Sequence, residues 1–177
     1  MAEIGLDSPI TRDNAPGNFL KLFYPYHYNV GMALEKALSN AVLDRHQTVI
    51  LWLIHSQGSG NSEIPRKLIE RQIGEWYELG SPAISKALRK LARPPLALIA
   101  IDESKNSGRE KTIRLTDAGR RFVGEMMAKG NAFIARIVEH LSDAQIHAGM
   151  DFMARVSEIV DRDFEPSSKP SGGPATG

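Results

Sequence analysis

The chain of 177 residues is predicted to be mostly α-helical with one small β-hairpin, which is an α+β fold. Apolar side chains recur at three- and four-residue spacing through most of the chain, and this spacing places them on one face of an α-helix. The period changes to two only between residues 96 and 115, as is typical of paired strands. A hydrophobic content of 42% with only 7% aromatic residues favours packing between helices over a thick β-sandwich.

The folded part is expected to be a single domain at residues 19–164. Residues 1–18 and 165–177 are predicted to be disordered tails, and the second is rich in Pro, Gly and Ser. The N-terminal segment lacks the basic and apolar regions of a secretion signal, and no run approaches the roughly 18 apolar residues of a membrane span. We therefore expect a cytoplasmic protein with no membrane partner.

The first half of this domain is predicted to contain three helices. Apolar residues at helical spacing indicate a helix over residues 25–43. Asp44 and Gln47 form a capping-box pattern that opens a second, very apolar helix, which the GSGNS segment at 58–62 ends. A third helical pattern follows in IPRKLIERQIGEWYEL, residues 64–79.

The segment SPAISKALRKLA, residues 81–92, is predicted to be an amphipathic helix. Ser81 can accept backbone N–H bonds at its start, and Pro82 suits the first helical position, where a missing N–H is tolerated. At about 100° per residue, the buried stripe consists of Ile84, Ala87, Leu88 and Leu91. The opposite side carries Pro82, Lys86, Arg89 and Arg93, with Ser85 at its flank.

A β-hairpin is predicted next, with strands at residues 96–103 and 109–115 joined by the turn SKNSG. It lies in a basic part of the chain, because residues 81–121 contain ten basic and four acidic residues, a net charge of +6. The whole chain carries +1, so the remainder carries −5. Such asymmetry is typical of a nucleic-acid-binding face, and a basic surface with no partner is the alternative.

Two long helices are expected to complete the domain. Thr116 caps the first, which runs towards His140, and a second capping box of Ser142 with Gln145 opens the last helix, which reaches about Phe164. Both helices, like the first helix of the domain, are too long and too apolar to be covered by a small core. Their apolar stripes are therefore predicted to pack against a partner chain.

The helices at 64–79 and 81–92 fit the helix-turn-helix pattern, which requires a small residue where the two helices touch. Gly74 takes that position, and the turn position where glycine is usual holds Glu78, with a glycine two residues later at Gly80. The apolar positions of the pattern fall on Ile73, Tyr77, Leu79, Ile84 and Ala87. A helix-turn-helix followed by a β-hairpin describes a winged helix.

The chain resembles the MarR-type transcriptional regulators, which are dimeric winged-helix DNA-binding proteins. The resemblance rests on ISKALRKLA, then a two-stranded wing containing Gly108-Arg109, then IRLTDAGRRF, and further on LSDAQ before a terminal helix. It covers roughly residues 26–164 and is most specific between residues 73 and 122. It implies a winged helix-turn-helix at about 44–116 and dimerisation helices at about 25–43 and 117–164.

The resemblance also implies how the protein would contact DNA. The helix beginning at Ser81 would enter the major groove, where Ser85 and Lys86 face base edges and Arg89 reaches a base or a phosphate. Arg109 would enter the minor groove from the wing, although Ser107 stands where the family often has an aspartate that orients this arginine. The predicted DNA-binding residues are Ser81, Pro82, Ser85, Lys86, Arg89, Arg93, Lys105, Asn106 and Arg109, where Lys105 and Asn106 would add phosphate contacts from a lengthened wing.

We therefore expect a sequence-specific double-stranded DNA-binding transcriptional regulator of the MarR type. It is expected to be a homodimer that binds a palindromic operator and acts as a repressor responding to a small-molecule effector. The alternative is a winged helix that serves as a protein-interaction module without sequence-specific DNA binding. Basic residues on both the predicted recognition helix and the wing favour DNA, because a docking module does not require them.

Other features indicate neither an enzyme nor a metal site. The chain has no cysteine, so thiolate catalysis and cysteine zinc sites are excluded, and no catalytic or nucleotide-binding motif occurs. No cofactor is expected, and no metal-ligand spacing occurs among His46, His55, His140 and His147. Either a ligand pocket or, preferably, a dimer interface would explain the aromatic residues near His27, namely Phe19, Phe23, Tyr24, Tyr26 and Tyr28.

Overall fold

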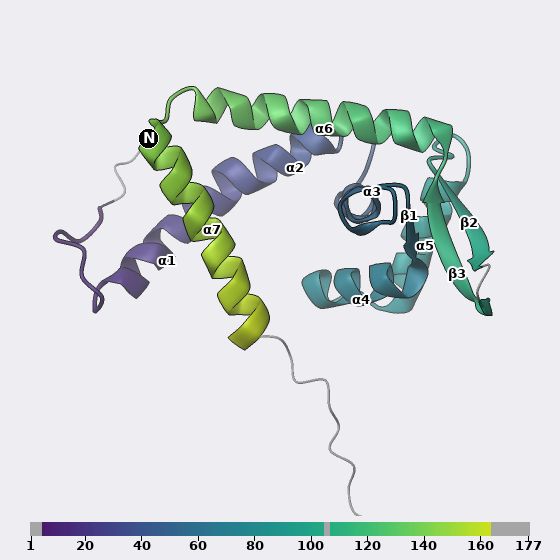
Figure 1. Ribbon diagram of the computed structural model, residues 1–177, viewed down its shortest axis with the longest axis horizontal. Coiled ribbons are helices and arrows are strands. Elements are labelled where there is room, and N and C mark those ends of the chain that lie inside the picture. The colour runs from purple at the N-terminus through teal and green to yellow at the C-terminus, as the bar shows by residue number, and fades with distance from the viewer. Residues whose placement is uncertain (1–4, 105–106, 164–177) are drawn as a thin grey trace, which may run out of the picture. The chain divides into compact units, whose positions relative to one another are not determined.

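The computed structural model describes residues 5–104 and 107–163, and the side chains of residues 104–109 lie outside this description (Figure 1). The described residues fall into two units, which meet between Ile134 and Ala135, and each unit is described by itself. No helix within the described ranges is both long and apolar enough to span a membrane.

The predicted fold class is confirmed, because the chain is mostly helical and contains one small antiparallel sheet. A π-helical turn, η1 (His27–Gly31), joins the first two helices. The helices are α1 (Ala15–Tyr26), α2 (Met32–Leu38), α3 (Arg45–Gln57), α4 (Arg66–Tyr77), α5 (Ser81–Ala92), α6 (Asp117–Val138) and α7 (Asp143–Asp163). The strands are β1 (Glu63–Pro65), β2 (Ile99–Ser104) and β3 (Ser107–Leu115).

The first helical stretch differs at both ends from the helix predicted at residues 25–43. It begins at Ala15 and continues through Pro25 and Tyr26 into η1. The proline has no N–H to donate, and the wider π-helical turn after it accommodates the interrupted hydrogen-bond pattern. It ends at Leu38, where Asn40 and Ala41 take φ angles of 54° and 56° and lead the chain out of the helix.

Part of the predicted N-terminal tail at residues 1–18 is also held to α1. The Asp7 N–H donates to the Asn18 side-chain oxygen at 2.9 Å, and the Asn18 side chain is buried, with 3% exposure. Lys21 forms an ion pair with Asp7 at 3.0 Å. Composition indicated a tail, but these hydrogen bonds tie the segment to the helix. The tail predicted at 165–177 lies outside the described residues.

The sheet has the strand order β1-β3-β2, with both pairings antiparallel. Ile113 of β3 lies opposite Ile64 of β1 on one side and opposite Ile101 of β2 on the other. The hairpin of β2 and β3 was predicted, whereas β1 was not, because three residues are too few to establish a period of two. β1 extends the wing towards α4, which begins at the next residue, Arg66.

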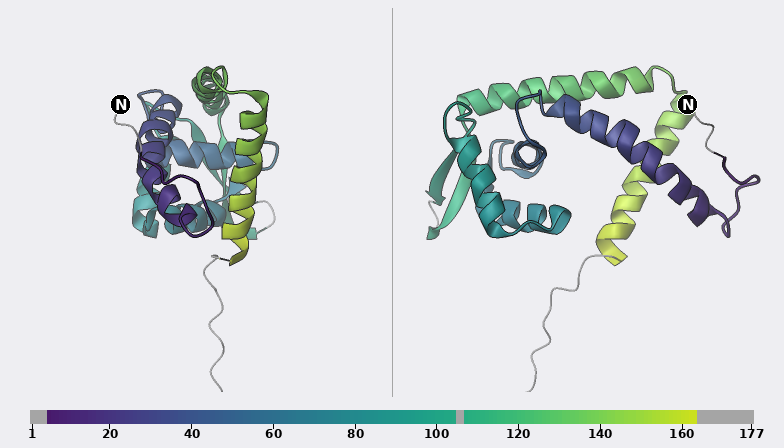
Figure 2. Two further views of the ribbon diagram at one scale, coloured as in Figure 1. Left: turned by 90° about the vertical axis from the view of Figure 1, so that its left-hand side faces the viewer. Right: turned by 180° about the vertical axis from the view of Figure 1, so that it is seen from behind.

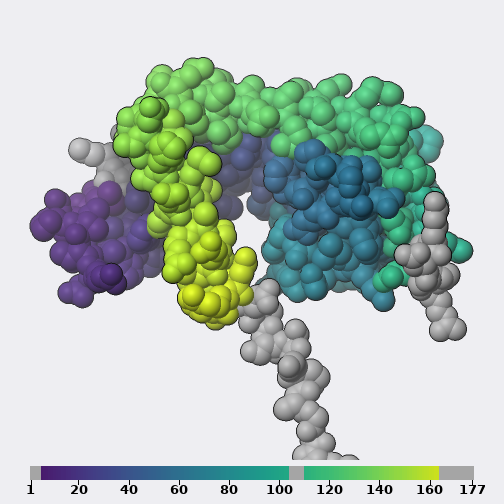
Figure 3. Space-filling model, in the orientation of Figure 1, coloured from purple at the N-terminus to yellow at the C-terminus, as the bar shows by residue number. Residues whose placement is uncertain are grey.

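The hydrophobic core lies between α3, α4, α5 and the sheet. Figure 3 shows α3 and α4 as one continuous mass beneath α6. Each fully buried leucine or isoleucine stabilises the fold by about 1.5–3 kcal/mol relative to an exposed one. The largest fully buried side chains are Ile50, Leu51, Leu53, Ile54, Ile64, Ile69, Ile73, Ile84, Leu88, Leu91, Ile99 and Ile113. The stripe predicted for α5 is thus buried, and its opposite side faces away from the core.

α2 packs against α6 on the other side of this core, as the views in Figures 1 and 2 agree. A Cβ atom added at Gly130 of α6 would lie 2.7 Å from the Leu38 side chain, so the two helices approach closely at this glycine. Asn40 beside the end of α2 contacts Lys129 and accepts from it, and donates to Glu125 at 3.4 Å. These contacts hold α2, which is part of the dimerisation helix predicted at residues 25–43, against α6 within the first unit.

The LTDAG segment fixes the start of α6 against the wing. The Thr116 hydroxyl accepts from the Gly119 N–H at 3.0 Å, as predicted for a cap, and donates to the Ala97 carbonyl at 2.8 Å. The Thr116 N–H donates to the Leu98 carbonyl at 3.0 Å. A Cβ atom at Gly119 would lie 1.9 Å from that carbonyl oxygen, so only glycine fits. The backbones of α6 and the wing therefore touch directly.

α7 belongs to the second unit and begins as predicted. The Ser142 hydroxyl accepts from the Gln145 N–H at 3.3 Å, and the Gln145 side chain accepts from the Ser142 N–H at 2.9 Å. Within this chain, α7 buries none of its described residues. Its exposed large apolar side chains are Met150, Phe152, Met153, Val156 and Val160.

We predict that Gly119→Ala lowers the free energy of unfolding by about 1–3 kcal/mol, because the new methyl group overlaps backbone that cannot move aside. Gly124→Ala in the same helix is the control. Its Cβ would have no neighbour within 4 Å, so alanine there should raise the free energy of unfolding by up to about 1 kcal/mol. Urea denaturation followed by circular dichroism measures both changes, and equal effects would contradict the close approach.

Candidate nucleic-acid interface

The exposed side of α5 carries a row of cations, here called the α5 cationic face. It consists of Lys86, Arg89 and Lys90 together with Arg93 at the C-terminal end of the helix, and all four residues are exposed. None of the ion pairs among the described residues includes any of them. The four cations also line an open cleft of about 610 Å³ beside Pro94. Their charge is therefore directed at solvent and is available to an anionic partner.

The two predicted serine contacts lie at the N-terminal end of this helix, but neither is free of partners. Gly80 is the residue before the first helical turn, and no side chain caps it, so the prediction that Ser81 caps the helix is wrong. The Ser81 hydroxyl instead donates to Glu70 at 3.3 Å. Ser85 lies half-buried on the flank, as predicted, and its hydroxyl accepts from Arg66 at 2.7 Å. Pro82 is exposed in the first turn.

Arg66 is a residue of this surface that the sequence analysis missed. Its Nε and Nη2 atoms donate to one carboxylate oxygen of Glu70 at 2.9 and 2.8 Å. The two side chains are only 24% and 28% exposed, which makes this the least exposed ion pair among the described residues. In the sequence, the pair is an arginine and a glutamate four residues apart, and this spacing usually marks an ordinary helix surface.

The wing contributes further charges, of which only some are described. Lys105 and Asn106 lie outside the described residues, and Arg109 is placed in β3 without its side chain. Arg114, at the base of the wing, forms an ion pair with Asp102 across the hairpin at 3.1 Å. Lys67 of α4 forms an ion pair with Glu110 of β3 at 3.3 Å, and this pair joins the wing to the helix-turn-helix.

Comparison with known proteins agrees with this geometry. A family model described as a winged helix DNA-binding domain matches residues 43–119. A MarR family protein from Bacillus stearothermophilus has the same fold, with 16% sequence identity and a TM-score of 0.71, over 86% of this chain and 100% of that one. The chain has the MarR-type winged-helix fold.

Two further structures share the MarR-type fold. A putative MarR family transcriptional regulator from Listeria monocytogenes, complexed with 26mer DNA, is 18% identical with a TM-score of 0.57, over 76% of this chain and 86% of that one. BpsR from Bordetella bronchiseptica, whose DNA binding is regulated by 6-hydroxynicotinic acid, is 17% identical with a TM-score of 0.56, over 85% and 99%. A search of curated protein sequences gave no match. The function that the matched family model names, over residues 43–119, is DNA binding.

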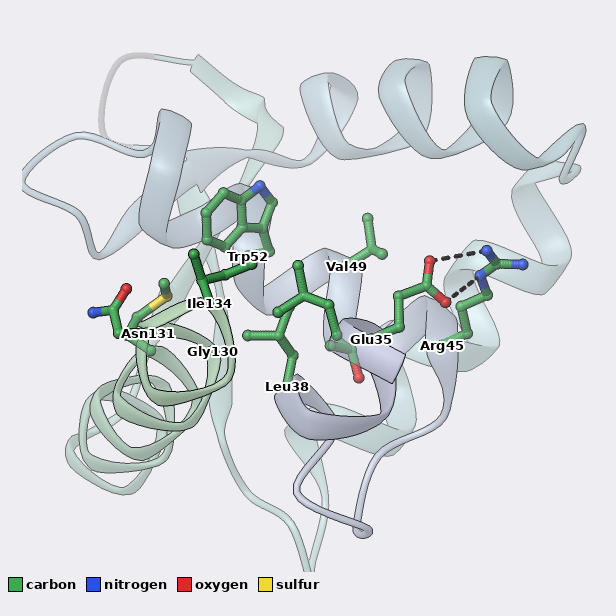
Figure 4. A pocket seen from close by; sticks show the side chains of 11 residues that line it. Glu35, Leu38, Arg45, Val49, Trp52, Gly130, Asn131 and Ile134 are labelled. Atoms are coloured by element: carbon green, nitrogen blue, oxygen red, sulfur yellow. Dashed lines mark hydrogen bonds and ion pairs between the residues drawn. The ribbon is translucent and has the colours of Figure 1, made fainter. Parts of the chain in front are cut away.

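The first unit also has an apolar pocket of about 310 Å³ between α2, α3 and α6 (Figure 4). The sequence analysis assigned no ligand-binding residue. At one side of the pocket, the Glu35 carboxylate forms an ion pair with Arg45 at 2.8 Å, as the dashed lines in Figure 4 mark. The lining residues are Leu34, Glu35, Leu38, Arg45, Thr48, Val49, Trp52, Met127, Gly130, Asn131 and Ile134.

Arg45 links this pocket to the helix-turn-helix. Its guanidinium lies over the Tyr77 ring, 5.3 Å from the ring centroid, at the C-terminal end of α4. The hydrogen bond to Glu35 raises the pKa of Arg45 above its ordinary value. Burial, with the Glu35 charge as a second cause, raises the pKa of the Tyr77 phenol. The guanidinium and the phenol therefore keep their usual charge states at neutral pH, and the contact persists as a cation–π interaction.

The aromatic cluster of α1 and η1 is exposed and does not line this pocket. Phe23 stacks on His27 with ring centroids 5.8 Å apart, and Tyr24 stacks on Tyr28 at 5.9 Å. All five aromatic residues named in the sequence analysis are more than half exposed. Exposed aromatic side chains grouped on one helix are typical anchors of a protein interface. The cluster is thus separate from the apolar pocket, and its place in a dimer interface stays a prediction.

The turn of the helix-turn-helix depends on Glu78. This residue takes φ 52° and ψ 33°, the left-handed conformation that a glycine adopts without strain. Gly80, by contrast, has an ordinary φ of −72°. The glutamate at the position where the pattern usually has glycine therefore adopts the glycine conformation, and the turn is made despite the substitution.

We predict that Glu78→Gly raises the free energy of unfolding by up to about 1 kcal/mol, because it removes the cost of a left-handed side-chain-bearing residue. Glu78→Val should lower it by about 1–2 kcal/mol, because a β-branched side chain is disfavoured there. Gly80→Ala is the control and should have little effect, since its Cβ would lie 3.6 Å from Pro82. Thermal denaturation of the three variants tests the order, and a stabilising Glu78→Val would contradict it.

Proposed function

We propose that this MarR-type protein is a sequence-specific double-stranded DNA-binding transcriptional regulator, acting as a homodimeric repressor that responds to a small-molecule effector. The observation that carries the proposal is the α5 cationic face, whose cations form no ion pair within the described residues and lie opposite a fully buried stripe. Burial of that stripe fixes the direction of the face. A helix that presents unpaired lysine and arginine at a surface is suited to the major groove and its flanking phosphates.

Each predicted contact has a different role in this proposal. Lys86 and Ser85, near the start of α5, face base edges, and Arg89 and Arg93 lie further along the helix, where phosphates flank the groove. Arg109 enters the minor groove from the wing. Ser81 and Pro82 would approach the DNA at the start of the helix, and Lys105 and Asn106 in the wing would contact phosphates. The DNA complex of the Listeria monocytogenes regulator with the same fold supports this arrangement.

A homodimer is proposed because each unit leaves apolar side chains exposed that a second copy would cover. α7 buries none of its described residues, although Met153 and Val156 lie on it, and α1 exposes its aromatic cluster. A symmetric pair buries the same surface from both chains and presents two α5 helices related by a two-fold axis. The proposed operator is therefore palindromic.

An effector is proposed to bind in the apolar pocket between α2, α3 and α6. A pocket of about 310 Å³ with mostly apolar walls suits a small organic molecule. Such a ligand would lie beside the Glu35–Arg45 pair and would disturb the contact of Arg45 with Tyr77 at the end of α4. Ligand binding would thereby alter the position of the turn before α5. The regulation of BpsR by 6-hydroxynicotinic acid supports an effector for this fold.

We predict different losses of DNA binding for the two basic elements. Lys86→Ala should lower the ratio of operator to random-DNA affinity, because a good base contact contributes about 1–3 kcal/mol of discrimination. Arg109→Ala should weaken binding to both DNAs and flatten the slope of log affinity against log salt by roughly one unit per protomer. Fluorescence anisotropy at several salt concentrations, with an operator selected from random-sequence DNA, measures both.

The control for these variants is Arg155→Ala, which removes an exposed cation from α7 that is paired with Glu158. It should leave DNA affinity and its salt dependence unchanged. If neither Lys86→Ala nor Arg109→Ala changes DNA affinity, or if the wild-type protein shows no salt-dependent binding, the protein-interaction module is the better description.

We predict that the wild-type protein is a dimer at micromolar concentration and that Val156→Asp weakens the dimer. The substitution places a charge on the exposed apolar side of α7, and burying an unpaired carboxylate at an interface is costly. Ser157→Asp is the control, because it adds the same charge at an exposed polar neighbour. Sedimentation equilibrium measures both, and a stable wild-type monomer would rule out the dimer.

A further inference from the structure

Four polar side chains, from Arg66, Glu70, Ser81 and Ser85, are in contact where the start of α4 lies beside the first turns of α5. Arg66 follows β1 directly, and Glu70 lies one turn later on the same helix. Glu70 accepts from Arg66 at 2.8 and 2.9 Å and from the Ser81 hydroxyl at 3.3 Å, all on the same carboxylate oxygen. Arg66 also donates to the Ser85 hydroxyl at 2.7 Å. The predicted base-reading residue Ser85 is therefore one member of a network.

This network lies at the surface of the protein. Arg66 and Glu70 line a cleft of about 270 Å³ together with Lys67 of α4 and with Glu110 and Lys111 of β3. The cleft lies between the helix-turn-helix and the wing, the two elements proposed to contact DNA. A ligand that occupies the proposed interface therefore lies beside these side chains.

The chemistry of the two groups fixes the direction of their hydrogen bond. A guanidinium has five N–H donors and no acceptor, so Ser85 must be the acceptor in its contact with Arg66. A serine hydroxyl has one donor and two acceptor lone pairs, and Arg66 occupies one of those lone pairs. The Ser85 O–H donates to none of the described residues and remains available.

Glu70 keeps the guanidinium in this position. A carboxylate on a DNA-binding surface repels phosphates and by itself weakens binding. Its two contacts from Arg66 involve Nε and Nη2, which fix the plane of the guanidinium and direct the second N–H of Nη2 at Ser85. Glu70 thus limits the orientations of Arg66, and Arg66 in turn limits those of the Ser85 hydroxyl.

We propose that Arg66 is a specificity-determining residue that acts through Ser85, and that Glu70 is the residue that positions it. By donating from a charged group to one acceptor site of Ser85, Arg66 polarises this hydroxyl, so that it acts better as a hydrogen-bond donor than as an acceptor towards the operator. This inference rests on the proposed function, in which α5 lies in the major groove.

The base that Ser85 faces is then favoured if it presents an acceptor. In the major groove, guanine presents N7 and O6, adenine presents N7 and thymine presents O4, whereas cytosine presents only the donor N4–H₂. One position of each half-site should therefore prefer guanine, adenine or thymine over cytosine. A serine free to rotate would accept from cytosine as readily as it donates to the other bases.

The test uses the full chain and an operator selected by the wild-type protein from random-sequence DNA. Relative affinities for all four base pairs at each half-site position are measured for wild type, Ser85→Ala, Arg66→Met and Arg66→Lys. The wild type should disfavour cytosine at one position by at least about fivefold. Ser85→Ala and Arg66→Met should reduce that preference to less than about twofold at the same position and leave other positions unchanged, because each removes the directed donor.

Arg66→Lys is the matched control, because an ammonium group still donates to Ser85 and keeps the charge. It should retain the preference against cytosine, whereas methionine has a similar length but no donor. Glu70→Gln weakens the hydrogen bonds that hold the guanidinium and should partially reduce the preference against cytosine. This variant replaces Arg66→Met in the test if Arg66→Met does not fold. Circular dichroism establishes that each variant used is folded.

Three results would overturn the inference. In the first, Arg66→Met weakens binding to all sequences equally and keeps the preference against cytosine, which would make Arg66 a phosphate contact alone. In the second, Ser85→Ala removes the preference while Arg66→Met and Glu70→Gln retain it. In the third, the wild-type protein enriches no sequence, and then the proposed function fails together with the inference. In the first two cases the wild-type protein still enriches a DNA sequence, so the inference fails while the proposed function stands.

Discussion

The burial of one side of α5 is the constraint on which the rest of the structure depends. Ile84, Leu88 and Leu91 are fully or almost fully buried against the core that α3, α4 and the sheet provide. Each such side chain stabilises the fold by about 1.5–3 kcal/mol, so the helix cannot rotate about its axis without losing most of this energy. The direction of every other side chain on α5 follows. The cations face solvent because the apolar stripe cannot, and the flank that carries Ser85 is held against Arg66.

The properties of α5 that depend on the spacing of its apolar residues were predictable from the sequence. Those that depend on which hydrogen-bond partner a side chain has were not. A stripe at helical spacing identifies the buried side of α5 whatever it packs against. Ser81, by contrast, has a hydroxyl that could bond to the backbone of its own helix or to a neighbouring side chain, and it bonds to Glu70, eleven residues away. The role of Arg66 was hidden for the same reason, since its contact with Ser85 joins residues from two helices.

The ends of the elements differ from the prediction where a single contact, a backbone conformation or the shortness of an element decides them. Residues near Asn18 were assigned to a tail from their composition, yet this buried amide bonds to the backbone of Asp7 and extends the ordered region. α2 ends earlier than its apolar pattern does, because Asn40 and Ala41 adopt left-handed backbone conformations that the pattern does not encode. Strand β1 consists of three residues with one buried side chain, which is below the length at which an alternation can be recognised. Pattern therefore predicts the centres of elements better than their limits.

The backbone contact at Gly119 has a mechanical consequence. Because Thr116 and Gly119 join the start of α6 to Ala97 and Leu98 by hydrogen bonds and direct contact, this junction has no room to act as a hinge. α6 and the wing then keep their relative orientation and move together. In a symmetric assembly, a small change in the angle at which two such helices cross would be amplified along their length and would change the distance between the two wings. The distance between two such wings would thus depend on the packing of α6, away from the α5 cationic face.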